Sequence, residues 1–224
     1  MLLSFLATVP AAAAGTTVAQ VLRATRAAIG HESSVQVSFR AHAPSTKKSE
    51  VIRADIGAAE GSETVTVGTA TLTVRVTTSA VYVHGNASGL TTVLGLTSAE
   101  AKKAGSHWVM WAHGTSQYTT LKPDVTLPSV VELLPKAKGT ALSTVTSGGV
   151  ATYRLKWTTA GSSSEPRLTN MLELTTGAAP LPVEVRSSGS DGSTISTRLS
   201  DWGQPIAVTA PPPSDTIAAA KITG

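Results

Sequence analysis

The chain of 224 residues contains no cysteine, and both charged residues (14%) and aromatic residues (4%) are scarce. The lack of cysteine excludes disulfides, thiolate zinc sites, a cysteine nucleophile and a lipid-modified cysteine in this chain. Glu and Lys, which normally cover helix surfaces, are few, so an all-helical protein is disfavoured. Ser and Thr make up about a quarter of the chain, and β-branched Thr suits the exposed face of a strand. The composition therefore favours a β-rich protein.

The basic residues of the chain are scattered, although the formal net charge is +4. The only adjacent pairs of basic residues are Lys47–Lys48 and Lys102–Lys103. Nucleic-acid-binding proteins usually carry a basic stripe with interleaved aromatic residues. The sequence therefore predicts no nucleic-acid partner, and leaves open a weak attraction to anionic envelope surfaces.

The N-terminal residues 1–14, MLLSFLATVPAAAA, have the pattern of a secretory signal peptide. Leu2 to Val9 form a short apolar core, and Ala11 to Ala14 offer a small-residue cleavage site before Gly15. A bilayer-spanning helix needs about 20 apolar residues, so this core is too short to span a membrane. Basic residues normally precede such a core and are missing here, so a signal peptide that is truncated at its start stays open as an alternative. The alternative is a buried N-terminal helix. We expect export, with no transmembrane span elsewhere in the chain.

Hydrophobic periodicity predicts one helix, then strands, then short helices, then strands again. The first helix is expected over residues 17–29, with apolar residues at i, i+3, i+4 and i+7 spacing. Turn residues such as Gly68, Gly149 and Gly177 separate the alternating segments. Strands are predicted at residues 34–42, 50–57, 63–67, 70–76, 80–85, 142–159 as a hairpin, 167–176, 180–188 and 193–203, and short helices at 90–96, 97–104 and 128–134.

This order of elements is typical of an α+β protein with a long antiparallel sheet and helices gathered on one face. A sheet of about ten strands is expected to curl rather than stay flat. We expect one domain over residues 15–212, and a flexible Pro-rich C-terminal tail over residues 213–224.

The sequence holds no strong catalytic or metal-binding motif. No G-x-S-x-G elbow, phosphate-binding loop or H-E-x-x-H sequence is present. Ser45 and Lys48 match S-x-x-K in a polar turn, where a chain this rich in Ser produces such matches by chance. An enzyme would require a polar cleft with close titratable groups, such as His84 beside a carboxylate. The sequence therefore predicts neither an enzyme nor a metal or cofactor site.

The segment GSHWVMWAHG, residues 105–114, concentrates two histidines and two tryptophans. As a strand it places His107, Trp111 and His113 on one face, and the two histidines lie about 20 Å apart, too far to share one metal ion. We therefore interpret the segment as a structural strand. Trp108 is predicted to be substantially buried, and Trp111 to be more exposed.

Three segments carry a resemblance to a known family. They are AVYVHGNASGL (80–90), LTSAEAKKAGSHWV (96–109), where a helix stops before Trp108, and STRLSDWGQPIAVTAPPPSD (196–215), with an Asp-Trp-Gly-x-Pro turn. In these features and in the order of its elements, the chain resembles the actinobacterial LppX/LprG-type envelope lipoproteins, which have a LolA-like fold.

The resemblance implies a half-open β-barrel whose concave face is covered by short helices. It also implies an apolar cavity between sheet and helices for the acyl chains of lipids or glycolipids, with no catalytic residues. Residues expected to line such a cavity are Val37, Phe39, Leu72, Val74, Leu90, Leu94, Trp108, Val130 and Leu134. A filled core would need the same apolar residues, so the sequence leaves this alternative open.

One feature departs from the lipoprotein pattern. Members of the family carry a cysteine at the signal cleavage site, whereas Ala11 to Thr17 contain none. We therefore expect a secreted or envelope-located protein without a lipid anchor, monomeric, and holding a lipid or other apolar ligand. The alternative is an envelope structural or interaction protein with a filled core and a protein partner.

Overall fold

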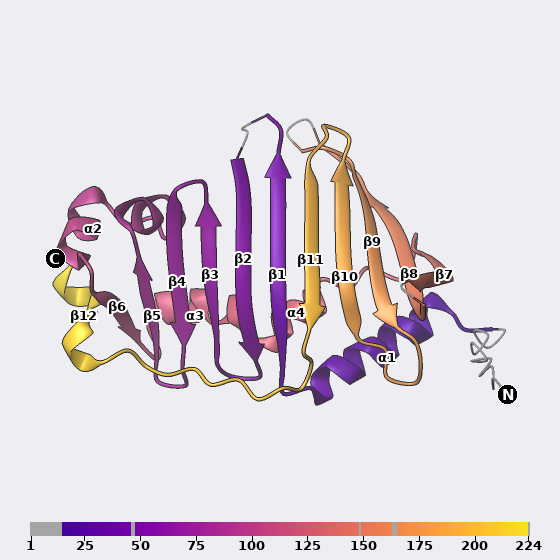
Figure 1. The fold of residues 1–224 in the computed structure, drawn as a ribbon, viewed down its shortest axis with the longest axis horizontal. Helices are drawn as coiled ribbons and strands as arrows, with labels where there is room; N and C mark the ends of the chain where they lie inside the picture. Colours follow the sequence, from indigo (N-terminus) through magenta and orange to yellow (C-terminus); the bar gives the residue numbers. More distant parts are fainter. Residues whose placement is uncertain (1–14, 46–47, 148, 163–164, 224) are drawn as a thin grey trace, which may run out of the picture.

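A single open β-sheet dominates the computed structural model of the chain, which describes residues 15–45, 48–147, 149–162 and 165–223 (Figure 1). Its twelve described strands are β1 Ser34–Ala43, β2 Lys48–Gly57, β3 Gly61–Val67, β4 Ala70–Val76, β5 Ala80–Gly85, β6 Trp108–Ala112, β7 Ala141–Ser147, β8 Val150–Thr159, β9 Leu168–Thr175, β10 Pro182–Gly189, β11 Thr194–Ser200 and β12 Thr216–Ala218.

The spatial order of the strands is β12-β6-β5-β4-β3-β2-β1-β11-β10-β9-β8-β7. Neighbouring strands are antiparallel except β12 and β6, which are parallel. The first strand of the chain therefore lies in the middle of the sheet, because β11 returns to pair with its free side. The sheet is not closed, and β7 and β12 form its two edges.

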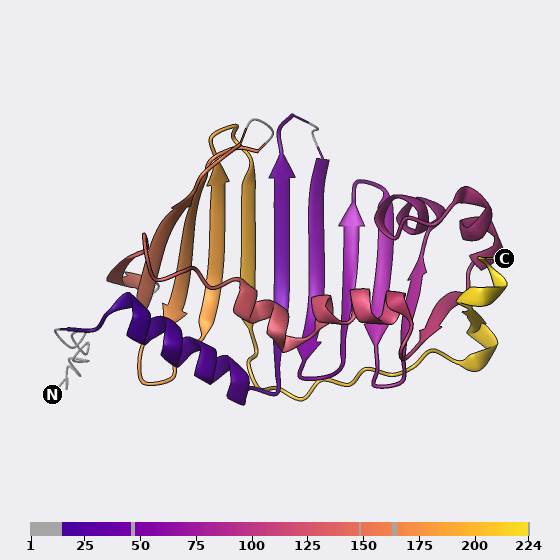
Figure 2. The same ribbon diagram turned by 180° about the vertical axis from the view of Figure 1, so that it is seen from behind.

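The helical segments are short apart from the first. They are α1 Val18–His31, the π-helical turn η1 Gly89–Val93, α2 Ser98–Ala104, α3 Ser116–Leu121, the 3-10 turn η2 Pro123–Val125, α4 Leu127–Glu132, and the 3-10 turns η3 Pro213–Asp215 and η4 Ala219–Lys221. Figure 2 shows α1, α3 and α4 lying against the same face of the sheet. The expected α+β half-barrel with helices on one face is therefore confirmed.

Alternation of apolar and polar residues produces the two faces of the sheet. In β4, Leu72, Val74 and Val76 are buried, whereas the intervening Thr73 and Arg75 are only half-buried. Gly68 turns the chain between β3 and β4 with φ 60°, a backbone conformation that favours glycine. The residues of β4 that share a face with Leu72 therefore point toward the helices, and Arg75 points to the uncovered face.

Local sequence signals set the helix boundaries. Thr17 caps α1 and forms a capping box with Gln20. Helix α2 begins at a second capping box, between Thr97 and Glu100, and ends at Gly105 with φ 58°. Both devices satisfy backbone N–H groups that a helix start leaves without partners.

The C-terminal segment is ordered, which corrects the expectation of a flexible tail over residues 213–224. Strand β12 pairs in parallel with β6, so that Ile217 lies opposite Val109. Ile222 is 0% exposed, and its backbone carbonyl accepts a hydrogen bond from Lys103 Nζ. The unpaired edge of β6 and the apolar residues of the tail explain this docking. The prediction of flexibility is wrong for residues 213–223, and residues 224 and 1–14 lie outside the described part of the chain.

Two apolar clusters fill most of the space between sheet and helices. The β4–β6 cluster contains Leu72, Val74, Val76, Val81, Val83, Leu90, Val109, Trp111, Val125 and Ile222. The α1–α4 cluster contains Leu22, Ile29, Val35, Ile56, Val130, Leu134, Leu155, Leu172, Leu174 and Leu199. Between them they anchor nearly every helix to the sheet, so the interior consists of two packed halves.

The two tryptophans of β6 lie on the opposite faces from those predicted. Trp111 is 6% exposed and belongs to the β4–β6 cluster, whereas Trp108 is half-buried on the uncovered face. The register explains the difference, because Trp111 and Val109 pair with Val81 and Val83, which are fully buried. The prediction of a buried Trp108 and a more exposed Trp111 is therefore wrong.

Candidate functional site

The candidate site is an apolar cavity of about 470 Å³ on the helix-covered face of the sheet. Its floor is formed by β1, β2, β3, β10 and β11, and helix α4 with the turns η1 and η2 forms its cover. The lining residues are Val37, Phe39, Glu50, Ile52, Ala54, Ile56, Glu63, Val65, Val93, Asp124, Ser129, Val130, Leu133, Val185, Ser187, Ile195 and Thr197.

The cavity lies at the junction of the two apolar clusters. Val65 and Ile52 belong to the β4–β6 side of the junction, and Ala54, Val130 and Val185 belong to the α1–α4 side. Because α4 packs mainly against α1 and η2, its apolar residues leave the middle of the sheet incompletely filled. The space is therefore a consequence of how the two packed halves meet.

The cavity continues toward the end of the strands where β1 and β2 are joined. A second recess of about 240 Å³ shares Glu50 and Ile195 with it and adds Ala41 and Val67 to the wall. Figure 2 shows that the helices cross the sheet away from this end, so the long central strands extend beyond them. This direction gives a ligand a path between the cavity and the outside.

Three carboxyl groups interrupt the apolar wall: Glu63 on β3, Asp124 on η2 and Glu50 on β2. Burial raises the pKa of Glu63 to about 7, and the charges of Asp124 and Glu50 add to this effect. The pKa of Asp124 is also raised, first by burial and then by the charge of Glu132 on α4. A carboxyl group in an apolar, acidic environment keeps its proton more readily than one in water.

Three of the nine expected cavity residues line this cavity, namely Val37, Phe39 and Val130. Leu72, Val74 and Leu90 are buried within the β4–β6 cluster, and Leu94 packs against it. Leu134 is buried in the α1–α4 cluster, and Trp108 lies on the opposite face of the sheet. The structure thus brings together the residues of the central strand β1 and helix α4, and places the others in packed core.

Several lining residues were missed from the sequence. Ile52, Ala54 and Ile56 alternate along β2 on the face that carries the cavity, and Val185 and Ile195 come from β10 and β11. Alternation identifies the apolar face of each of these strands. Which stretch of that face lies beneath α4 depends on strand pairing across the middle of the sheet, for which the sequence contains no local signal.

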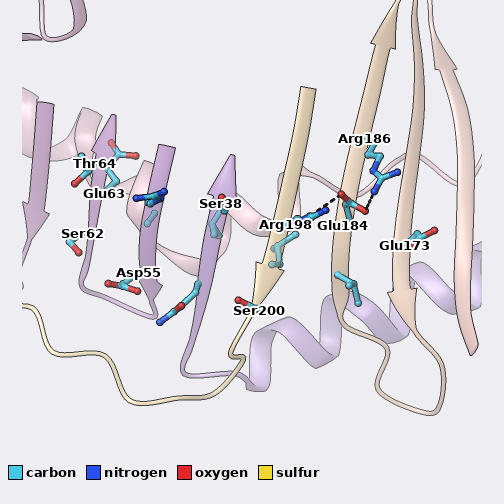
Figure 3. A pocket seen from close by; sticks show the side chains of 16 residues that line it. Ser38, Asp55, Ser62, Glu63, Thr64, Glu173, Glu184, Arg186, Arg198 and Ser200 are labelled. Atoms are coloured by element: carbon cyan, nitrogen blue, oxygen red, sulfur yellow. Dashed lines mark hydrogen bonds and ion pairs between the residues drawn. The ribbon is translucent and has the colours of Figure 1, made fainter. Parts of the chain in front are cut away.

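The uncovered face of the sheet holds a larger and more polar groove of about 900 Å³. Figure 3 shows Glu184 of β10 between Arg186 and Arg198, with Ser38 and Asp55 farther along the groove. Burial of Glu184 favours a raised pKa, but hydrogen bonds from Arg186, Arg198 and Ser196 outweigh it and hold the pKa below its usual value. The acidic groups at this end therefore already have partners, and Glu173 likewise pairs with Arg154 at 2.6 Å.

The histidine that a catalytic hypothesis would use lies against an aromatic ring. His84 stacks on Trp108 with a centroid distance of 5.2 Å, and the Arg75 guanidinium lies 4.6 Å from the centroid of the same indole. His113 contacts the ring of Tyr118, and His107 bonds to the carbonyl of Ala104. Among the described residues, no group of three or more His, Asp or Glu side chains is arranged to hold a metal ion.

No helix within the described ranges is both long enough and apolar enough to cross a membrane. This finding agrees with the short helices of the fold, of which α1 has 14 residues.

Comparison with solved structures shows a similar fold in one mycobacterial protein. The chain matches LprF from Mycobacterium bovis with a TM-score of 0.54 and 18% identity, over 87% of this chain and 96% of that chain. It matches the lipoprotein LppX from Mycobacterium tuberculosis with a TM-score of 0.48 and 15% identity, over 86% and 97%. No protein-family model matches the chain, and no curated protein sequence matches it. The resemblance seen in the sequence is therefore confirmed at the level of the fold.

Proposed function

We propose that this protein is an exported, non-catalytic binding protein that holds the apolar chain of a lipid or a similar ligand. The observation that carries the proposal is the cavity of about 470 Å³ between sheet and helix α4, with walls that are apolar except at a few carboxyl and hydroxyl groups. Ligand cavities in proteins have volumes of roughly 300–1,000 Å³ and linings of this kind.

The energetics of the cavity favour occupation by an apolar chain. Three apolar side chains that face this space are only half-buried, namely Phe39, Ile52 and Val93. A ligand that covers them removes more apolar surface from water, which lowers the free energy. Removing apolar surface from water contributes about 25 cal/mol per Å², on the ligand as well as on the wall. A volume in the lower half of the usual range favours one chain over a lipid with several chains.

The fold supports the same proposal. LprF has this architecture, and the sequence resemblance to the LppX/LprG-type lipoproteins implies an acyl-chain cavity between sheet and helices. The signal-like residues 1–14 are the basis for proposing export to the envelope or the exterior. Catalysis is not part of the proposal.

Extraction and displacement experiments test the proposal. We expect organic extraction or native mass spectrometry of the purified protein to release a lipid, and we expect uncharged Nile red to bind and to be displaced by acyl compounds. Val93→Trp, which fills the cavity from η1, should weaken Nile red binding about tenfold or more, because the ring occupies the space of the ligand.

The matched control for this experiment is Val150→Trp. Val150 is 64% exposed on β8, outside the cavity, so the same substitution there should leave binding unchanged. Absence of any co-purified lipid together with absence of Nile red binding would refute the carrier function. It would favour a structural or interaction protein of the envelope instead.

A further inference from the structure

The charges on the cavity wall are of one sign only, and they restrict the ligands that the cavity accepts. Building on the proposed function, we infer that the cavity selects a single-chain amphiphile whose polar end is uncharged and bears hydroxyl groups, such as a long-chain alcohol or a monoacylglycerol. It rejects the ionised carboxylate of a free fatty acid. The apolar walls define the site, and Glu50, Glu63 and Asp124 determine its selectivity.

The first argument is the absence of a counter-charge. Three carboxyl groups line the cavity, and none of the described lining residues is Lys, Arg or His. An ionised carboxylate in this space would meet like charges in a medium that screens them poorly, which is strongly unfavourable. Proteins that accommodate a carboxylate usually supply a guanidinium, which binds it with two parallel hydrogen bonds.

The second argument is that the nearby basic side chains lie outside the cavity or contact other groups. His42 lines the adjoining recess together with Glu50, and its Nδ1 lies 3.3 Å from Ser49 Oγ. Arg53 on β2 is paired in register with Thr64 and Ser38, and all three line the groove on the opposite face. Lys122, just before η2, lies 5.5 Å from the ring centroid of Tyr118. On the helix side, the charged neighbour of Asp124 is Glu132 of α4, which is acidic as well.

The third argument concerns the positions of the carboxyl groups along the cavity. Glu63 lies in register with Ala54 and Val37, beneath the helical cover, whereas Glu50 lies in register with Ala41, where the cavity meets the second recess. Between these two levels the wall consists mainly of Phe39, Ile52, Val65, Val185 and Ile195. A chain can lie along this apolar stretch while a hydroxyl group donates a hydrogen bond to a carboxyl oxygen at either level.

Competition with ligands of equal chain length tests the inference. Dodecanol, 1-monolauroylglycerol, lauric acid and dodecylamine are titrated against bound Nile red at pH 8 and pH 5. At pH 8 we expect the alcohol and the monoacylglycerol to bind about tenfold or more tightly than laurate, and at least as tightly as the amine. At pH 5, where Glu63 is protonated, the disadvantage of lauric acid should shrink severalfold.

Two neutralising variants and one control complete the experiment. Glu63→Gln and Asp124→Asn should each reduce the preference for alcohol over laurate at pH 8 about threefold or more, since each removes a repulsive charge. Glu165→Gln, on an exposed loop outside the cavity, should leave the preference unchanged. Thermal unfolding curves confirm that each variant is folded.

The outcomes separate this inference from the proposed function. Equal binding of laurate and dodecanol at pH 8, or an unchanged preference in both neutralising variants, would overturn the inference while leaving the carrier function in place. Tighter binding of dodecylamine than of both uncharged ligands would also overturn it, in favour of cationic amphiphiles. Failure of all four compounds to displace Nile red would count against the carrier function itself.

Discussion

Asp124 of η2 raises the pKa of Glu63 on β3, and both carboxyl groups line the same cavity. The larger contribution to this shift is the burial of Glu63 itself. A carboxyl group in such a position costs folding free energy once it ionises, and natural cores avoid this arrangement unless a function uses it. The relationship therefore joins the stability of the protein to its proposed ligand selectivity.

Glu63→Gln should change how stability depends on pH. The pKa of Glu63 is about 7 in the folded protein, above the ordinary value of 4.5. Between these two pH values the carboxyl group is therefore mostly protonated in the folded protein and mostly ionised in the unfolded chain. The stability that this group provides is present below pH 4.5 and is lost as pH rises to about 7. At pH 8 the Gln variant should be more stable by up to about 3 kcal/mol.

Urea unfolding of the wild type and of Glu63→Gln at pH 4.5 and pH 8 measures this difference. Glu165→Gln, on the exposed loop, serves as the control and should follow the wild type at both pH values. A Gln variant that is less stable than the wild type at pH 8 would contradict the assigned direction of the pKa shift.

Glu184→Gln should have the opposite pH signature. Hydrogen bonds from Arg186 and Arg198 hold the pKa of Glu184 below its ordinary value, against the effect of burial. This group therefore contributes stability above its unfolded pKa, and the contribution is lost as pH falls through the folded pKa. Because the two guanidinium groups are largely exposed, the loss at pH 7 should be about 1 kcal/mol. Urea unfolding at pH 7 and pH 3 checks this, and a difference that grows toward pH 3 would refute it.

Ile222→Ala should destabilise the whole protein, because the C-terminal segment is part of the core. Ile222 is 0% exposed within the β4–β6 cluster, and truncation of such a residue costs about 2–4 kcal/mol. Val150→Ala, at a 64% exposed valine, is the matched control and should change stability by less than about 0.5 kcal/mol. Equal stability of the two variants would mean that residues 216–223 do not dock on β6.

Tryptophan fluorescence distinguishes the two faces of β6. Trp111 is enclosed in the β4–β6 cluster, whereas Trp108 is half-buried on the uncovered face beside His84. The emission of each tryptophan is obtained as the difference between the wild type and the corresponding Phe variant, Trp108→Phe or Trp111→Phe. Acrylamide should quench the emission of Trp108 more strongly than that of Trp111. Trp111→Phe should also lower the unfolding temperature more, since it leaves a cavity in the core. Stronger quenching of Trp111 than of Trp108 would contradict this assignment and would support the buried Trp108 predicted from the sequence.

Much of the fold was predictable because it depends on local patterns. Alternation along Ala70–Val76 identified β4 and its buried face, and apolar spacing placed the first helix over residues 17–29, where α1 lies. The orientation of β6 was not predictable, because WVMWA places a large aromatic residue on each face. The docking of the C-terminal tail was not predictable either, because its short apolar sequence does not indicate that it pairs with β6.

The sequence by itself determined the β-rich class, the faces of the strands with clear alternation, the place of the first helix and the lack of any thiol chemistry. These properties follow from backbone preferences and from periodicity, which act over a few residues. The sequence did not predict helix α3. Only the tertiary structure decided which apolar residues fill the core and which face an open space. Leu72 and Phe39 look alike in sequence, yet one is packed in a cluster and the other lines the cavity. The difference arises because α4 covers the centre of the sheet without filling it, and that depends on contacts between segments far apart in the chain.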